Sequence, residues 1–291
     1  MSGKLLLIDK DRLKDLIPSI AAKMKFRPAI IEKDYYLTVV LNNINSLLSD
    51  KIVFKGGTLL NKVHLNYHRL SEDLDFTYYQ EITTRSQRSQ AIKPIREKIL
   101  GFGKALGLTT DNPKGEGFNN STQYVFNLKY PSIVTAKNEN IKIEVSLRQH
   151  PLDKPIYNEI KHFYQDPFTG EDFIPMGKVL SLSLKEAVAE KLKAAINRKN
   201  IAIRDYYDLW HLAEFGFNFS NPEFIKIFMR KLKDENYQGD FRINFGLTKD
   251  QLENLQQQVE PFLLPVIRSG ERFDLQMVLD RFNGILEHAY L

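Results

Sequence analysis

The sequence has no cysteine and no long apolar run, and each absence excludes a class of protein. Without cysteine the chain has no disulfide framework, no thiolate metal site and no cysteine nucleophile. No apolar run approaches the roughly 20 residues that span a bilayer. The leucine run near the N-terminus is too short for a signal peptide. We therefore expect a cytoplasmic protein with no membrane partner.

Several motifs of nucleotide and hydrolase chemistry are missing too. The sequence contains no Gly-x4-Gly-Lys-Ser/Thr, so any phosphate-binding turn is not of the P-loop kind. Gly-x-Gly-x-x-Gly, His-Glu-x-x-His and Gly-x-Ser-x-Gly are also absent. What is present is an ordinary globular composition over 291 residues, 43% apolar and 26% charged. The net charge of +5 permits a nucleic-acid partner, but solvated lysines explain it equally well.

Hydrophobic periodicity indicates an α+β arrangement in the first part of the chain. Helices are expected at residues 11–25, 28–48, 58–67 and 86–107, with a loop at 109–117. Strands are expected at residues 52–54, 122–130 and 140–147, and over 74–79 with a start close to Asp73. Residues 150–177 carry four prolines and no clear periodicity, which makes this segment the candidate linker.

The remainder of the sequence is almost purely helical. Ser183 is the expected N-cap of a helix that runs to residue 198, with Glu186 at the capping-box position. Further helices are expected at residues 204–215, 222–233, 248–262 and 272–291. We therefore predict two domains, residues 1–177 with the strands and residues 178–291 as a helical bundle.

A turn suited to phosphate follows the first predicted strand. Gly56, Gly57 and Thr58 stand between β-prone residues and a helical pattern. Two glycines let the backbone approach a ligand closely, and the amides at the start of a helix suit a phosphate. By itself this tripeptide is a weak signal, so its weight depends on what accompanies it.

A pair of aspartates accompanies it, Asp73 and Asp75, separated by one residue. On a strand, residues i and i+2 point to the same face, so the two carboxylates converge. Such carboxylates are hard oxygen ligands that Mg²⁺ takes together with substrate phosphates. Glu144 is the candidate third acid, because it alternates with the apolar Ile143 and Val145 on another strand. The alternative is an N-capping turn followed by a polar edge strand, with Glu144 facing solvent.

The segment FKGGTLLNKVH…HRLSEDLDF resembles the AbiEii-type nucleotidyltransferase toxins, a group that includes the MenT enzymes. Matching blocks continue with IEKDYYLTVVL from residue 31, KIEVSL from 142, and LKEAVAEKLKAAINR…RDYYDLWHL from 184 to 212. These toxins belong to the polymerase-β-like nucleotidyltransferase superfamily. The resemblance implies an α+β fold, in which a nucleotidyltransferase domain with a mixed sheet precedes a C-terminal helical bundle.

The resemblance also implies roles for the residues of the turn and the strand. Gly56, Gly57 and Thr58 would lie at the nucleotide phosphates, and Asp73 and Asp75 would bind the metal, with Glu144 as the third ligand.

Three further residues receive roles from the same resemblance. Lys191 would contact the triphosphate, and Asp205 would complete the catalytic set. A surface ion-pair network is the alternative for both. Ser71 stands where some relatives have a functional hydroxyl, and it could equally cap the turn before the strand. The site is expected in a cleft between the two domains.

The predicted reaction is the transfer of a nucleoside monophosphate from an NTP, with Mg²⁺ or Mn²⁺ as the metal. The resemblance implies a toxin of a toxin–antitoxin or abortive-infection system, with a cognate antitoxin and the 3′ end of tRNA as acceptor. A basic stretch that begins at Lys191 could contact RNA phosphates; it contains Lys191, Lys193, Arg198, Lys199 and Arg204. The alternatives are a protein or small-molecule acceptor, and an inactive binding module of the same fold.

Overall fold

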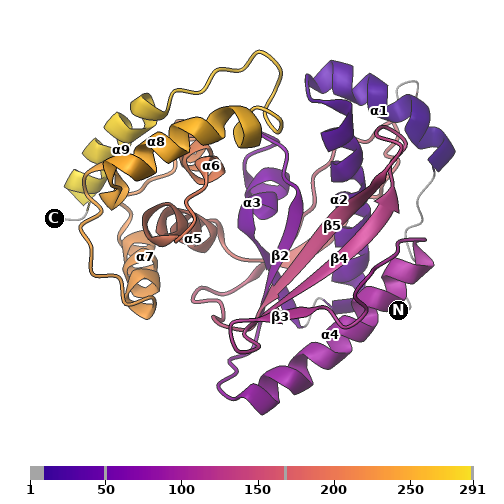
Figure 1. The fold of residues 1–291 in the computed structure, drawn as a ribbon, viewed down its shortest axis with the longest axis horizontal. Coiled ribbons are helices and arrows are strands. Elements are labelled where there is room, and N and C mark those ends of the chain that lie inside the picture. Colours follow the sequence, from indigo (N-terminus) through magenta and orange to yellow (C-terminus); the bar gives the residue numbers. More distant parts are fainter. Residues whose placement is uncertain (1–9, 49–50, 167–168, 290–291) are drawn as a thin grey trace. The chain divides into compact units, whose positions relative to one another are not determined.

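The computed structural model describes residues 10–48, 51–166 and 169–289. The chain divides into two compact units, Met1–Leu182 and Ser183–Leu291 (Figure 1). The division into two domains at residues 177 and 178 stays a prediction.

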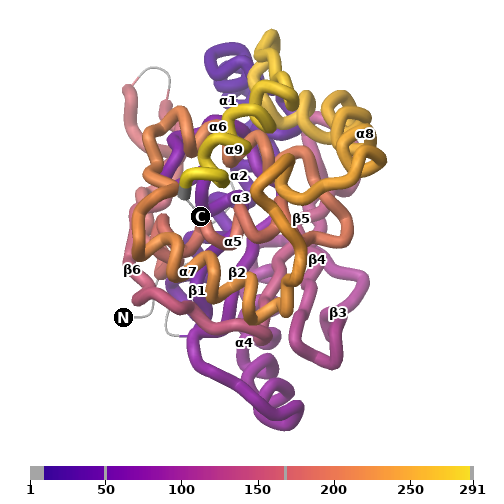
Figure 2. The backbone as a smooth tube through the Cα atoms, turned by 90° about the vertical axis from the view of Figure 1, so that its left-hand side faces the viewer, coloured from indigo at the N-terminus to yellow at the C-terminus, as the bar shows by residue number. Residues whose placement is uncertain are grey.

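A mixed sheet forms the centre of the first unit. Its described strands follow the order β3-β4-β5-β2-β1-β7-β6, and Figure 2 shows β6 and β3 at opposite edges. The strands are β1 (Ile52–Lys55), β2 (Asp73–Tyr78), β3 (Glu116–Phe118), β4 (Gln123–Pro131), β5 (Asn138–Ser146), β6 (Ile156–Glu159) and β7 (Lys178–Ser181). Parallel pairing of β2 with β5 and of β1 with β7 makes the sheet mixed, because the other pairs are antiparallel.

The described helices of the first unit pack on this sheet or on one another. They are α1 (Lys10–Met24), α2 (Pro28–Leu48), α3 (Gly56–Leu59), which continues as a π-helix over Leu60–His64, and α4 (Arg85–Ala105). Most side chains of α2 are buried because this helix is apolar around most of its circumference. Its Tyr36 stacks on Tyr130 of β4, with ring centroids 3.9 Å apart. The predicted helices at 11–25, 28–48 and 86–107 are confirmed to within two residues.

A buried polar network fastens the segment after the glycine turn to α2. The Lys62 ammonium lies 2.8 Å from Asp34 Oδ1 and donates to Thr38 Oγ1 at 2.7 Å. Both ionic side chains are fully buried. Burial lowers the pKa of Lys62, and the charge of Asp34 opposes this shift. Glu32, two residues before Asp34, is also buried and accepts a hydrogen bond from the Ile133 amide at 2.7 Å. These α2 acids therefore hold the fold together.

The prediction that residues 150–177 form a linker was wrong. Within this segment β6 pairs antiparallel with β7 at the sheet edge, and the side chains of Ile160, Tyr164 and Ile174 are buried. The Tyr164 hydroxyl donates to Asp34 Oδ2 at 2.9 Å. The segment is therefore part of the first unit. Its strand was missed because β6 lies at an edge and shows no apolar alternation. The short β3 likewise overlaps the expected loop at 109–117.

The second unit is a bundle of helices, as predicted. Its described elements are α5 (Leu184–Asn197), α6 (Ile203–Glu214), α7 (Pro222–Asp234), a 3₁₀ turn (Asn244–Gly246), α8 (Lys249–Gln258) with a π-helix over Val259–Leu263, and α9 (Leu275–Ala289). Ser183 caps α5 by accepting from the Glu186 amide at 3.2 Å, which confirms the predicted N-cap. The Glu186 carboxylate pairs with the buried Lys231 of α7 at 2.8 Å.

Among the described residues, no helix has both the length and the apolar character that crossing a bilayer requires.

Candidate active site

The turn between β1 and α3 can be built only with glycine. Gly56 has a φ of +79°, and a Cβ atom at this position would lie 2.2 Å from Asp75 Oδ2. At Gly57 a Cβ atom would lie 2.6 Å from Nη2 of Arg69. The backbone of the turn therefore lies directly against a carboxylate and a guanidinium group.

Thr58 joins the turn to the start of β2. Its hydroxyl donates a hydrogen bond to the backbone carbonyl of Asp73, and its side chain is fully buried. The contact fixes the first turn of α3 against the strand that carries both aspartates. A positioning role for Thr58 follows from this contact.

The strand register brings three acids onto neighbouring positions of one sheet face. On β2, Asp73 and Asp75 alternate with the buried Leu74 and Phe76, as predicted. The parallel β5 places Glu144 opposite Asp75. We call Asp73, Asp75 and Glu144 the carboxylate face.

Lysines flank the carboxylate face on both sides. On β5, Lys142 lies opposite Asp73, with its ammonium 3.3 Å from Glu144 Oε2 and 3.8 Å from Asp73 Oδ2. On β1, Lys55 lies opposite Asp75. Sequence reasoning missed Lys142, although its position two residues before Glu144 on a strand places both side chains on the same face.

The electrostatics of the face show an excess of negative charge. Burial, followed by the charges of Glu144 and Asp73, raises the pKa of Asp75 from 3.8 to about 6, although Lys55 and Lys142 oppose the shift. Burial lowers the pKa of Lys142, but the three carboxylates outweigh it and raise this pKa above its ordinary value. The two lysines therefore do not fully compensate the three carboxylates.

The chemistry of these donors fits a hard divalent cation, because carboxylate oxygens are what Mg²⁺ and Mn²⁺ prefer. Within the described ranges, no three acidic or histidine side chains are already grouped as metal ligands. The donor types and their common face thus fit a metal, while their present positions leave the Lys142 ammonium next to two of the three acids.

Ser71 and Arg69 lie beside the glycine turn. Ser71 is buried, and its Oγ lies 3.5 Å from the place that a Cβ on Gly57 would take. Arg69 is also buried and donates from Nη1 to the Leu70 carbonyl at 2.9 Å. Ser71 is thus adjacent to the glycine turn. Arg69 was missed, although it stands only two residues before Ser71.

In the second unit, Lys191 and Asp205 lie together. The Lys191 ammonium on α5 lies 2.7 Å from Asp205 Oδ1 and 2.9 Å from Asp208 Oδ2, both on α6. Arg198 adds a second cation, 3.4 Å from Asp205 Oδ2. We call Lys191, Asp205, Asp208 and Arg198 the Lys191 cluster. Asp208 was not among the predicted site residues, although a spacing of i to i+3 puts it on the same helix face as Asp205.

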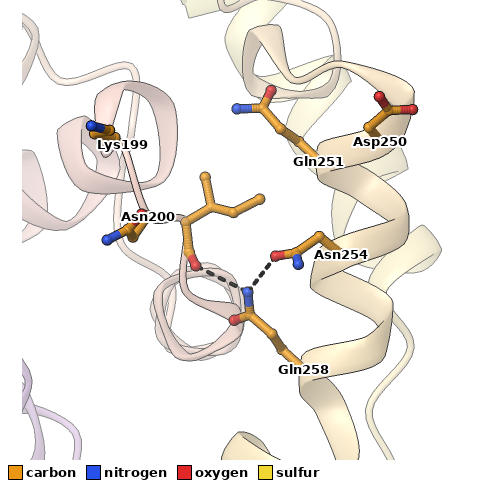
Figure 3. A pocket seen from close by; sticks show the side chains of 7 residues that line it. Lys199, Asn200, Asp250, Gln251, Asn254 and Gln258 are labelled. Carbon is orange, nitrogen blue, oxygen red and sulfur yellow. Dashed lines mark hydrogen bonds between the residues drawn. The ribbon is translucent and has the colours of Figure 1, made fainter.

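The predicted basic stretch is partly neutralised inside the second unit. Lys193 lies 3.2 Å from Glu235, and Lys191 and Arg198 are engaged by Asp205. Lys199 is exposed and lines a pocket of about 320 Å³ with Asn200, Ile201, Asp250, Gln251, Asn254 and Gln258 (Figure 3).

Carboxamide side chains dominate this pocket. Gln258 holds one wall in place, because its Nε2 donates to the Ile201 carbonyl at 3.1 Å and to Asn254 Oδ1 at 2.7 Å. Its Oε1 accepts from the Ile203 amide at 3.0 Å. In Figure 3 the Gln251 side chain extends from α8 toward the loop that carries Lys199 and Asn200.

Comparisons with known proteins agree with this fold. A family model described as the nucleotidyl transferase AbiEii toxin of a type IV toxin–antitoxin system matches residues 39–286. A comparison with curated protein sequences gives no match.

Two solved structures share the fold at low sequence identity. JHP933 from Helicobacter pylori is 16% identical, with a TM-score of 0.52 over 91% of this chain and 93% of that one. The nucleotidyltransferase toxin MenT4 from Mycobacterium tuberculosis is 15% identical, with a TM-score of 0.51 over 97% and 98% of the two chains. At such identities the likeness concerns the fold.

Proposed function

The chain belongs to the AbiEii family of nucleotidyltransferase toxins, and on this basis we propose that it transfers a nucleoside monophosphate from an NTP to the 3′ end of an RNA, with tRNA as the first candidate. The family confirms the expected enzyme class, a transferase. Magnesium dependence, the acceptor and the role of each residue belong to the proposal.

The position of the glycine turn beside the carboxylate face is the observation that supports this chemistry most directly. The glycine turn lies against Asp75, and Asp75 shares a sheet face with Asp73 and Glu144. A backbone that approaches a ligand closely, next to hard oxygen donors, suits a substrate made of phosphates and a divalent cation. Asp73, Asp75 and Glu144 would hold Mg²⁺ or Mn²⁺. When bound, the metal supplies positive charge to the phosphates as they react.

The remaining residues bind, orient and neutralise. Gly56 and Gly57 admit the phosphates, and Thr58 keeps Asp73 in place through its carbonyl. In the transfer, the acceptor oxygen bonds to the α-phosphorus as its proton leaves to water. The bond from that phosphorus to pyrophosphate breaks. Protein catalysis of such a step rests on positioning and on charge neutralisation.

Lys191 is the proposed cation for the triphosphate. An ammonium group neutralises the charge that a transferring phosphoryl group carries. Asp205 holds this ammonium at 2.7 Å, and in the proposal it orients Lys191. Ser71 is the proposed hydroxyl beside the phosphates, since it is adjacent to Gly57.

The pocket of Figure 3 supports RNA as the acceptor. Lys199 offers a charge for a phosphate, and the carboxamides of Asn200, Gln251 and Asn254 are groups that hydrogen-bond to base edges. Single-stranded RNA ends are recognised in this way, through bases that are free of stacking and pairing. A protein or small-molecule acceptor needs none of these contacts.

The test incubates the protein with each of four α-labelled NTPs, with Mg²⁺ or Mn²⁺, and with tRNA, total protein or small-molecule extract as acceptor. We expect label at the 3′ end of tRNA, and at least about a 1000-fold loss of transfer in the Asp73→Asn/Asp75→Asn variant. Label in protein or in a small molecule instead would show that tRNA is not the acceptor and would leave the enzyme class unchanged. Unchanged toxicity of the double variant would favour a binding module.

The pocket receives its own variant. Lys199→Ala/Asn254→Ala should raise the KM for tRNA and leave the KM for the NTP unchanged. An exposed lysine elsewhere in the second unit is changed in Lys226→Ala, which is the control for the loss of one positive charge. Equal effects of both variants would remove the pocket from the proposal.

A cognate antitoxin is the proposed protein partner. Growth arrest on expression of the toxin, reversed by co-expression of the gene beside it, tests this partner.

A further inference from the structure

Lys142 lies where its ammonium and a divalent cation would use the same oxygens. The register of β5 against β2 places it opposite Asp73, and the strand period places it on the same face as Glu144. Its Nζ lies 3.3 Å from Glu144 Oε2 and 3.8 Å from Asp73 Oδ2. Two of the three acids of the carboxylate face are therefore already engaged by a positive charge.

The charge of the carboxylate face favours replacement of the Lys142 ammonium by a divalent cation over addition of the cation beside it. Three carboxylates against Lys142 and Lys55 leave one excess negative charge. Adding a divalent cation would leave one excess positive charge, with the ammonium and the metal repelling each other at short range. Replacing the Lys142 ammonium with the divalent cation leaves the face neutral.

The surroundings of Lys142 allow such an exchange. Its side chain is 38% exposed, and four methylene groups let the ammonium reach water without a backbone change. By contrast, Lys62 in the same unit is fully buried and has no such exit. The carboxylates cannot move apart as easily, because they project from paired strands.

We propose that Lys142 is the resident counter-ion of the carboxylate face, which it stabilises when no metal is bound and which it leaves when a divalent cation binds. This inference rests on the proposed metal site. Lys142 is a positioning residue in this scheme: it sets how tightly the metal binds and keeps the three acids together until it does. Removal of its charge should therefore weaken the metal-free fold and strengthen metal binding.

The test uses the full chain without nucleotide and measures two quantities. Binding of Mn²⁺ is followed by the electron paramagnetic resonance signal of the free ion, and metal-free stability by thermal unfolding in EDTA. The variants are Lys142→Met, which keeps the stem and removes the charge, and Lys142→Arg, which keeps the charge. Lys129→Met is the matched control, because Lys129 is on the same sheet and pairs with Asp111.

For Lys142→Met we expect about tenfold tighter Mn²⁺ binding than in the parent, with a metal-free Tm lowered by about 2 °C. Lys142→Arg and Lys129→Met should bind Mn²⁺ as the parent does. If Lys142 had only a structural role, its replacement would lower both the stability and the metal affinity. Unchanged or weaker Mn²⁺ binding by Lys142→Met therefore overturns the inference.

A second comparison separates this inference from the proposed function. The Asp73→Asn/Asp75→Asn variant should lose Mn²⁺ binding if the carboxylate face is the metal site. When the parent binds Mn²⁺ and the double variant does not, the metal site stands and only the Lys142 result decides the counter-ion role. Absence of Mn²⁺ binding by the parent, or equal binding by the double variant, overturns both.

Discussion

The carboxylate face and the Lys191 cluster are built from the same kinds of group and differ in how the charges are matched. On the face, three acids meet two lysines, and the Lys142 ammonium lies 3.3 and 3.8 Å from the nearest oxygens. In the cluster, two acids meet Lys191 and Arg198, and the Lys191 ammonium lies at 2.7 and 2.9 Å. The Asp208 side chain is fully buried there, whereas that of Asp73 is 43% exposed.

The difference is that the charges of the Lys191 cluster are matched within the protein and those of the carboxylate face are not. Matched charges at short range can be buried, because each one compensates the desolvation of the other. Unmatched carboxylates raise the pKa of their most buried member, here Asp75, to about 6. Perturbed pKa values of this sort are typical of functional sites. The same substitution should therefore have opposite effects on stability in the two places.

Among single substitutions, the largest expected effect comes from crowding the carboxylate face without changing its charge. Gly56→Ala places a methyl group 2.2 Å from Asp75 Oδ2 at a φ of +79°. We expect nucleotidyl transfer to fall by about 100-fold or more, as the turn and Asp75 must move apart. Gly107→Ala is the control, because Gly107 has a φ of +73° and open space around it. Similar losses of transfer in both variants would mean that backbone strain alone is responsible.

Removing an acid from the matched cluster should cost stability. Asp208→Asn leaves the Lys191 ammonium with one buried partner, and we expect the free energy of unfolding to fall by about 3 kcal/mol. Urea unfolding at pH 7 measures it. Asp234→Asn is the control, since Asp234 pairs with Arg230 at an exposed i, i+4 position and its loss should cost less than about 0.5 kcal/mol. A stability equal to that of the parent would place the cluster with the surface ion pairs.

Removing an acid from the unmatched face should do the reverse. The folded pKa of Asp75 lies above its unfolded value, so ionisation of Asp75 opposes folding, and this contribution lowers stability as pH rises from 3.8 to about 6. Asp75→Asn should therefore raise metal-free stability by about 2 kcal/mol at pH 8. Most of the gain should vanish near pH 4. Urea unfolding in EDTA at both pH values checks the sign, and a less stable variant at pH 8 would contradict it.

The smallest expected effect separates the two roles of Ser71. Ser71→Ala removes a hydroxyl beside Gly57 without touching either set of charges. If the hydroxyl contacts the nucleotide, transfer should fall by about tenfold while stability changes by less than about 1 kcal/mol. Loss of stability with unchanged transfer would identify a turn cap. Steady-state kinetics and urea unfolding of one preparation give both numbers.

Elements with a strong period could be predicted, and elements defined by their neighbours could not. The apolar pattern of α2 gave its boundaries correctly, and the alternation around Glu144 gave a strand within two residues of β5 and the face of Glu144. By contrast, β6 has mostly exposed side chains and β7 has only four residues, so neither shows a period long enough to recognise. Both are strands because they pair with each other and, for β7, with β1.

The site shows the same division. Asp73, Asp75 and Glu144 were recognisable because the strand period decides which face each side chain takes. This holds for any strand order or register of the sheet. Lys142 has the same period, but its importance depends on β5 lying parallel to β2 in one register. That register puts a lysine opposite Asp73, and no local sequence pattern predicts the register.

The sequence by itself therefore determined the residue types, the strongly periodic elements and the family, because these depend on local periodicity and on motifs that are contiguous in the chain. Only the tertiary structure decided which charges are matched. It placed Lys191 between two acids of α6 and Lys62 against Asp34, and it left the carboxylate face with one negative charge in excess. The physical reason is that the energy of a charge depends on distance and burial, and neither is fixed before residues far apart in the chain pack together.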